Sequence, residues 1–289
     1  MAFNSIVCVK QVPDTANITS EAMTPEGTVN RGALPAIFNP EDLHALETAL
    51  EIRDRWGGTV TVVSMGPPKA AEVLRECLYR GADRAILLTD RRAAASDTLA
   101  TSYILSQAVK TVGNCDFVFC GRQAIDGDTA QTGPQIAEKL EVPQVTYLEE
   151  IVDAVRDAGG KATALIRRNT GNGWEVVKTQ LPALVTVLET ANEPRPMAAK
   201  KVLRYKKAAV AAEVSEDRVE TLKAAGLLLE QWTLDDIHAD LNRCGLAGSP
   251  TKVFRIESIV LTKEGFKEVA ATDAGIHDLV QELISDRTL

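Results

Sequence analysis

The sequence FVFCGRQAIDGDTAQTGP, residues 117–134, decides how the chain is expected to fold. Its apolar start, Phe117 to Cys120, is typical of a buried β-strand, and a helical pattern with one apolar face begins near Pro134. A strand that runs through a glycine-bearing loop into a helix presents backbone N–H groups and a positive helix end to a phosphate. The stretch therefore predicts the phosphate-binding turn of an α/β fold.

The loop itself is polar and contains residues suited to a nucleotide. Gly121 and Gly127 are expected to take positive φ and to let a ligand approach the main chain, and Arg122 adds a fixed charge. Groups that can hydrogen-bond a sugar or a base are Asp126, Asp128, Thr129 and Gln131. An ordinary polar connection is the alternative, but a long row of polar or small residues with no bulky filler except Ile125 favours ligand binding.

The first half of the chain alternates between apolar runs and helical patterns. Strands are expected near residues 5–9, 59–63, 84–88 and 116–120, and a loop at 10–14 leads to a turn-rich surface hairpin. The sequence Asn39-Pro40-Glu41-Asp42 is a helix start, with Asn as N-cap, Pro at the first helical position and acids in the first turn. Alternation of this kind predicts an open parallel sheet with helices on both faces.

The pattern changes after about residue 147. Two strand-like runs, 162–167 and 174–178, flank an Asn- and Gly-rich turn, so a β-hairpin insertion is expected at about 160–180. The apolar run 183–188 is interpreted as an antiparallel return to the sheet. The nucleotide-binding α/β domain is expected to span residues 1–207, followed by a C-terminal arm at 208–289 that packs on a partner and includes short helices at 233–237 and 271–284.

Composition excludes several classes of function. The net charge of −8 and the aromatic content of 4% argue against a nucleic-acid binder, and no apolar run approaches the roughly 20 residues of a membrane span. The start of the chain lacks the features of a signal peptide, and the five cysteines are scattered, which predicts a cytoplasmic protein. Three distant histidines and the absence of C-x-x-C spacing predict no metal site.

Standard catalytic motifs are missing from the sequence. No G-x-G-x-x-G follows the first strand, and no P-loop or G-x-S-x-G motif occurs. No residues are expected to be catalytic by themselves. Any chemistry must therefore enter with a cofactor.

At this point the chain resembles the beta subunit of electron-transferring flavoproteins over most of its length. The resemblance rests on Val7 to Asp14, Asn39-Pro40, Met65 to Pro68, Gly81 to Arg84, Gly121 to Gln131 and Asn192 to Arg195. It implies an adenine-nucleotide-binding, HUP-like α/β fold and pairing with an alpha subunit that carries a redox FAD. It also implies an adenine nucleotide at the carboxyl ends of the parallel strands, where ligands of open α/β sheets bind.

The family's site residues transfer to matching positions of this sequence. The resemblance implies that the cofactor is bound by Cys8, Asn39, Pro40, Glu41, Asp42, Met65, Gly121, Arg122, Gln123, Ala124, Ile125, Asp126, Gly127, Asp128, Thr129, Ala130, Gln131 and Thr132.

The family contains two kinds of beta subunit, which differ in the sequence of this loop. One kind binds AMP as a structural ligand and typically reads Lys-Gln-Ala-Ile-Asp-Asp-Asp-Cys-Asn-Gln; the other binds FAD, accepts hydride from NADH and bifurcates the electrons. Here Arg122 replaces the lysine, Gly127 the middle Asp, and Thr129-Ala130 the Cys-Asn pair. The loop sequence resembles that of the FAD-binding kind, and AMP is the alternative ligand. Drift at these positions is the other interpretation.

The resemblance also implies partners. These are the alpha subunit, a dehydrogenase or oxidoreductase, and a ferredoxin or flavodoxin as low-potential acceptor. The family's docking loop corresponds to residues 190–197, but Ala191 stands where a leucine anchor is expected, so an acyl-CoA dehydrogenase partner is less secure. The rival functions are an AMP-type electron shuttle, a nucleotide-sensing module without a redox role, and an ATP-consuming ligase, whose Ser-Gly-Gly loop is missing after the first strand.

Overall fold

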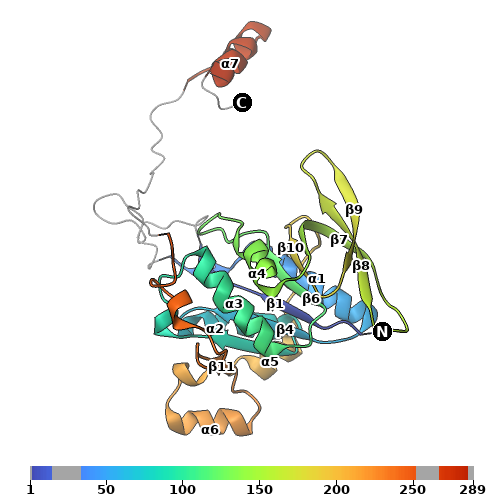
Figure 1. The fold of residues 1–289 in the computed structure, drawn as a ribbon. Helices are drawn as coiled ribbons and strands as arrows, with labels where there is room; N and C mark the ends of the chain where they lie inside the picture. Colours follow the sequence, from blue (N-terminus) through green and yellow to red (C-terminus); the bar gives the residue numbers. More distant parts are fainter. Residues whose placement is uncertain (1, 15–33, 252–266, 286–289) are drawn as a thin grey trace, which may run out of the picture.

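The computed structural model describes residues 2–14, 34–251 and 267–285, and Figure 1 shows how their elements are arranged. The helices are α1 Pro40–Trp56, α2 Ala71–Arg80, α3 Thr98–Val112, α4 Thr132–Leu140, α5 Ala199–Tyr205, α6 Glu216–Ala224 and α7 Asp273–Ser285. The strands are β1 Ser5–Cys8, β2 Gln11–Pro13, β3 Ala36–Phe38, β4 Val60–Met65, β5 Arg84–Leu88, β6 Phe117–Gly121, β7 Gln144–Arg156, β8 Ala162–Asn169, β9 Trp174–Gln180, β10 Ala183–Val187 and β11 Glu230–Trp232.

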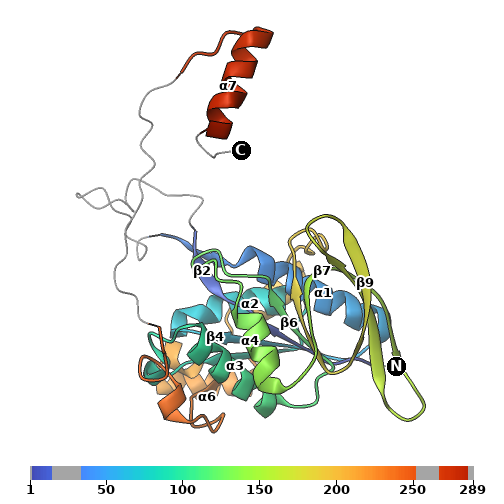
Figure 2. The same cartoon turned by 45° about the horizontal axis from the view of Figure 1, so that its top comes forward.

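The predicted open parallel sheet is confirmed. Nine strands follow the order β11-β5-β4-β1-β6-β10-β7-β8-β9, and all pairings from β11 to β7 are parallel. The expected hairpin is present as β8 and β9, which extend β7 in antiparallel fashion and project from the domain in Figure 2. The fold is therefore α/β with an antiparallel extension at one edge.

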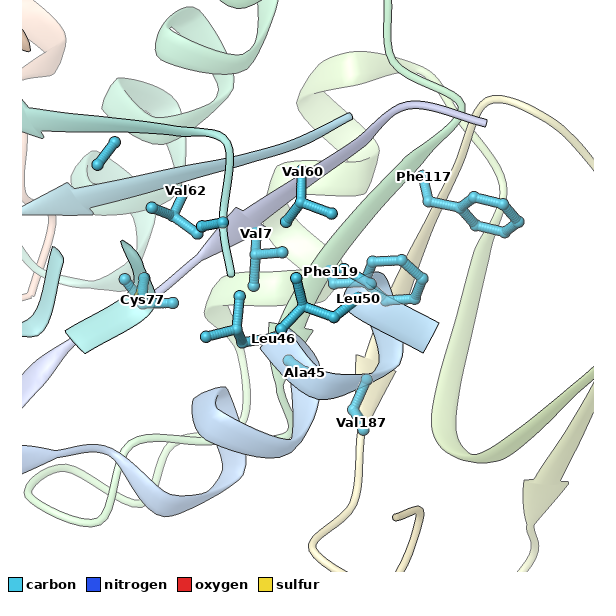
Figure 3. Packing of buried hydrophobic residues seen from close by; sticks show 14 of the residues in the cluster. Val7, Ala45, Leu46, Leu50, Val60, Val62, Cys77, Phe117, Phe119 and Val187 are labelled. Atoms are coloured by element: carbon cyan, nitrogen blue, oxygen red, sulfur yellow. The ribbon is translucent and has the colours of Figure 1, made fainter. Parts of the chain in front are cut away.

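Successive residues of the central strands point to opposite faces of the sheet and build two cores. Val7, Val62 and Phe119 pack with α1 and α2 on one face, which Figure 3 shows from close by. Ile6, Val63 and Val118 pack with α3 and α4 on the other. Strands buried on both faces explain why the sequence reads as continuous apolar runs, and helices on both faces are as predicted.

The direction of β10 was predicted wrongly. It runs parallel to both β6 and β7. Irregularities between Leu148 and Glu150, and again before Asp153, interrupt the pairing of β7 with β8, and bulges of this kind bend a strand. The chain is thereby returned to the amino edge of the sheet, where the N–H of Ala183 donates to the carbonyl of Asp116. From that edge, β10 can only run in the same direction as β6.

The segment after β1 also differs from the prediction of a loop. Gln11–Pro13 forms β2, which pairs antiparallel with β3, and Val12 lies opposite Ile37 with only 1% of its surface exposed. Burial of a β-branched residue explains why a strand forms there. The expected surface hairpin lies within 15–33, outside the described residues.

The expected arm divides into two parts with different surroundings. Residues 208–251 pack on the domain: β11 pairs with β5, and Leu234 and Ile237 are buried in the core. The helix expected at 233–237 is instead a turn, in which the Asp236 carboxylate accepts hydrogen bonds from both the N–H and the hydroxyl of Thr233. By contrast, α7 has no buried residue and stands apart from the sheet in both ribbon views (Figures 1 and 2).

Candidate functional site

The connectivity of the sheet places a topological switch point between β1 and β6. The chain proceeds from β1 to β4 and β5 on one side, and then returns to β6 on the other side of β1. Ligands of open α/β sheets bind at such a switch point, outside the carboxyl ends of the strands. Cys8, Met65 and Gly121 end the neighbouring strands β1, β4 and β6 at this edge, so the structure brings these three predicted residues together.

Cys8 and Cys120 are neighbours across the β1–β6 pairing. Both thiols are buried, and a hydrogen bond between them, together with desolvation, raises the pKa of Cys120 well above its ordinary value. The neutral thiol is therefore the stable form. Cys120 is therefore poorly suited to act as a nucleophile.

The start of α1 faces the loop that leaves β6. Asn39 occupies the N-cap position, but its side chain makes no capping hydrogen bond. Its Nδ2 donates to the carbonyl of Gln123 at 2.8 Å, and its Oδ1 accepts the N–H of Ile125 at 3.1 Å. The predicted helix start is confirmed, with Asn39 at the N-cap and Pro40 at the first helical position, but the Asn39 side chain joins the helix to the loop after β6 instead of capping the helix.

The two acids of the first turn are also directed at the loop. Glu41 accepts the N–H of Gln123 at 2.7 Å and forms an ion pair with Arg122, in which Oε1 and the guanidinium nitrogen are 2.8 Å apart. Asp42 accepts the N–H groups of Gly121 and Lys10, each at 2.9 Å. Both carboxylates are buried, so they serve internal contacts.

Asp42 has an unusual acidity for a carboxyl group. Burial raises its pKa to about 7, against the opposing effects of the Gly121 N–H, the Asn39 side chain and Lys10. The group therefore changes charge near neutral pH.

The glycines of the loop act differently from the expectation. Gly121 and Gly127 do not have positive φ; among the loop residues Asp128 and Ala130 do, at 46° and 51°. A Cβ on Gly121 would lie 2.7 Å from the carbonyl carbon of Glu41, so this glycine permits close packing on α1. A Cβ on Gly127 would meet nothing within 4 Å.

The second half of the loop presents a run of available N–H groups. Ala130 has φ of 51°, and Gln131 follows with φ of −101° and ψ of −27°, directly before α4. Alternating left- and right-handed residues turn successive N–H groups toward one side, which favours an anion. In the described chain, the N–H groups of residues 129–133 have no protein acceptor. Helix α4 adds its positive end, so these groups fit a phosphate or diphosphate.

Packing fixes the start of α4 at this edge. A Cβ on Gly133 would lie 2.7 Å from Cγ2 of Thr186, the penultimate residue of β10. Glycine at this position allows the first turn of the helix to approach the sheet closely.

Several loop side chains already have protein partners. Asp126 pairs with Lys10 at 2.7 Å, Asp128 accepts a hydrogen bond from Gln123 at 2.9 Å, and Gln131 accepts one from Thr98 at 3.0 Å. The carbonyl of Ala124 closes the turn by accepting the N–H groups of Gly127 and Asp128. The backbone is therefore the better candidate for ligand binding than these side chains.

Sequence reasoning missed three residues that shape the site: Lys10, Thr98 and Gly133. Lys10 lies just after β1 at the same edge of the sheet, and Thr98 is the first residue of α3. Their positions next to an expected strand and an expected helix were the sequence features that could have identified them.

The candidate site is an open edge. Gly127, Asp128, Thr129 and Gln131 are exposed. Three cavities of about 280, 400 and 240 Å³ lie elsewhere: along α1 and β7, on the antiparallel strands, and at the amino ends of the central strands. Within the described ranges, no cluster of His, Cys, Asp or Glu could hold a metal ion.

The segment expected to dock a dehydrogenase is tied to α1. Asn192 contacts His44 and Thr48, and Arg195 binds Glu47 and Asp54. Ala191, at the position of the expected anchor, is partly buried against the core. None of the helices in the described chain is long and apolar enough to cross a membrane.

The chain is similar to known proteins over most of its length. Residues 26–216 match the family "Electron transfer flavoprotein domain". Protein FixA of Sinorhizobium fredii is 42% identical over 285 residues, covering 97% of this chain and 92% of that protein. Electron transfer flavoprotein subunit beta of Clostridium acetobutylicum is 45% identical over 250 residues, or 86% of each chain. The caffeyl-CoA reductase-Etf complex subunit CarD of Acetobacterium woodii is 43% identical, covering 86% of each.

Proposed function

Because the chain belongs to the electron transfer flavoprotein family and is similar to its beta subunits, we propose that it binds FAD at the switch point between β1 and β6. The observation that carries this proposal is the run of N–H groups at residues 129–133, which lead into the first turn of α4 and have no protein acceptor in the described chain. Preorganised donors of this kind suit the diphosphate of a dinucleotide.

The proposed activity is electron bifurcation in a heterodimer with an alpha subunit. FAD bound here would supply the acceptor for hydride from NADH, and the two electrons would pass separately to the alpha-subunit FAD and to a ferredoxin or flavodoxin. The chain's own part is to bind the diphosphate and to hold the cofactor at an exposed edge that a partner can reach. NADH oxidation thus requires the complex.

The glycine at position 127 favours FAD over AMP as the bound nucleotide. Open space surrounds the position where its Cβ would lie, whereas the AMP-binding kind typically carries Asp there. A carboxylate at this point would add negative charge near a diphosphate. Arg122, which also differs from the AMP-binding kind, is engaged with buried Glu41. A direct contact between Arg122 and the flavin therefore forms no part of the proposal.

AMP is the second candidate ligand, because the same N–H groups fit a single phosphate. The experiment is to express the chain with its alpha subunit, extract the nucleotides and count them. Two FAD molecules per heterodimer are expected, and NADH should bleach the flavin absorbance. One FAD and one AMP per heterodimer would contradict the FAD proposal and support a shuttle of electrons for dehydrogenases. A colourless complex would favour a nucleotide-sensing module.

The C-terminal helix is proposed to contact the alpha subunit. Ile276, Val280 and Ile284 recur at intervals of four residues on α7, and their exposed fractions are 55%, 39% and 51%. Residues at this spacing share one helix face, and an apolar face gains stability when a partner covers it. We place the complex in the cytoplasm, consistent with the five free thiols.

A further inference from the structure

We propose that Asn39, Glu41 and Asp42, together named the α1 clamp, are positioning residues for the nucleotide. Their side chains hold the first half of the loop after β6, so that the N–H groups of residues 129–133 face the phosphates. This inference rests on the proposed function and assigns the α1 clamp a role through the loop, without direct contact with the cofactor.

Hydrogen bonds from the α1 clamp reach the loop at three successive points. Asp42 binds the N–H of Gly121, Glu41 binds that of Gln123, and Asn39 binds that of Ile125, at distances of 2.9, 2.7 and 3.1 Å. Every second N–H group along this stretch is thus fixed by one side chain from the first turn of α1.

The other functional atoms of the α1 clamp are also occupied. The second oxygen of Asp42 accepts the N–H of Lys10, the second oxygen of Glu41 pairs with Arg122, and Nδ2 of Asn39 donates to Gln123. Each oxygen of the two carboxylates thus already has a protein partner within the α1 clamp and the loop.

The α1 clamp is mounted on a rigid element. Helix α1 contributes Ala45, Leu46, Ala49 and Leu50 to the core, and none of these four side chains is exposed. Farther along the same helix, Glu47 binds Arg195 with its own buried carboxylate. The core thus fixes the position of helix α1. Hydrogen bonds from the side chains of its first turn then fix the conformation of the loop.

The numbers of hydrogen-bond donors and acceptors predict the effect of replacing one carboxylate of the α1 clamp by an amide. A carboxylate offers two acceptor oxygens, whereas the amide of the same shape offers one acceptor and one donor group. In Glu41→Gln, the side chain cannot accept from both the N–H of Gln123 and the guanidinium of Arg122. One of these two donors therefore loses its partner, and the loop loses its preferred conformation.

The test compares Glu41→Gln with Glu47→Gln in the heterodimer with the alpha subunit, after removal of bound nucleotide. Glu47→Gln is the matched control because it weakens a buried carboxylate–arginine pair on the same helix without touching the loop. Affinities for FAD, ADP and adenosine are measured by titration, and thermal unfolding is recorded alongside. Asp42→Asn is the second variant if Glu41→Gln does not fold.

For Glu41→Gln, the affinities for FAD and ADP should both fall about tenfold, while that for adenosine stays within about twofold. For Glu47→Gln, all three affinities should stay within about twofold, even where the melting temperature drops equally. An equal loss for adenosine would show direct contact with the nucleoside and overturn the positioning role, as would unchanged FAD and ADP binding. If the wild-type beta subunit binds none of the three ligands, the proposed function fails instead.

Discussion

Oδ1 of Asp42 accepts the backbone N–H of Gly121 at 2.9 Å and so joins two segments that lie 79 positions apart in the chain. The contact fixes the end of β6 against the start of α1, at the edge where the parallel strands present their carboxyl ends. Asp42, which the sequence predicts as a cofactor-binding residue, thus also joins these two segments of the site.

The pH dependence of stability should report the state of Asp42. Its pKa is raised from 3.8 to about 7 in the folded chain, so protonation favours the folded state. The stabilising contribution is present below about pH 4 and is lost as the pH rises toward 7. Relative to Asp42→Asn, the wild type should lose up to about 4 kcal/mol of unfolding free energy over this window, which urea titrations at several pH values measure. A difference that stays constant with pH would contradict the assignment.

The left-handed residue before α4 should control phosphate binding. Ala130 has φ of 51°, a conformation that is costly for a β-branched side chain. Ala130→Val should weaken FAD binding by about tenfold, because roughly 1–2 kcal/mol of strain opposes the binding conformation. Ala130→Gly should retain FAD, since glycine adopts this conformation readily. Fluorescence titration with FAD measures both variants, and equal affinity of the Val and Gly variants would refute the expectation.

Charge at position 127 should shift the preference between FAD and AMP. Gly127→Asp places a carboxylate in open space beside the proposed phosphate groups and should lower the affinity for FAD more than that for AMP. Gly127→Ala is the control for size: a Cβ there meets nothing within 4 Å, so binding and stability should change little. The ratio of the two dissociation constants is the readout. A ratio unchanged in Gly127→Asp would rule out a role for this position in selecting the nucleotide.

Replacement of apolar residues on α7 should impair assembly without unfolding the chain. Ile276→Lys together with Ile284→Lys should reduce recovery of the alpha subunit in co-purification, because both side chains are more than half exposed in this chain and are proposed to be covered by that partner. Leu203→Lys on α5, which is 68% exposed, is the matched control. Undiminished recovery of the alpha subunit with the double variant would argue against this interface.

Two glycines with similar backbone conformations should differ sharply on substitution. Gly245 has φ of 59°, and a Cβ there would lie 2.1 Å from the carbonyl oxygen of Arg92; Gly226 has φ of 64° and no neighbour within 4 Å. Gly226→Ala should cost about 1 kcal/mol through backbone strain alone. Gly245→Ala should cost roughly 2 kcal/mol more, since the segment after β11 must move away from the β5–α3 connection. Similar unfolding free energies would show that this packing is loose.

The central fold was predictable from the sequence because local signals agreed there. Apolar runs marked buried parallel strands, and starts such as Pro40 after Asn39 located helices that the structure confirms. The direction of β10 was not predictable, because bulges in β7 return the chain to the opposite edge. The burial of Leu234 and Ile237 was also missed, since two apolar residues in a short polar segment give no periodic signal.

For the site, the sequence located the loop after β6, but it did not show which loop residues contact α1 and which present available N–H groups. Glu41 and Asp42 read as ordinary first-turn acids, yet both side chains bind loop N–H groups through pairings that only the folded chain reveals. Gly121 was singled out for a close approach of a ligand, and the structure shows that α1 also approaches it closely. The positive φ of Ala130 carried no sequence signal, because alanine rarely adopts it.

The most direct test of the account is a crystal structure of the heterodimer with the alpha subunit and its bound nucleotides. We predict FAD at the switch point between β1 and β6, with pyrophosphate oxygens about 2.7–3.2 Å from backbone nitrogens of residues 129–133. A complex in which these nitrogens contact only protein or solvent, with every nucleotide bound elsewhere, would contradict it.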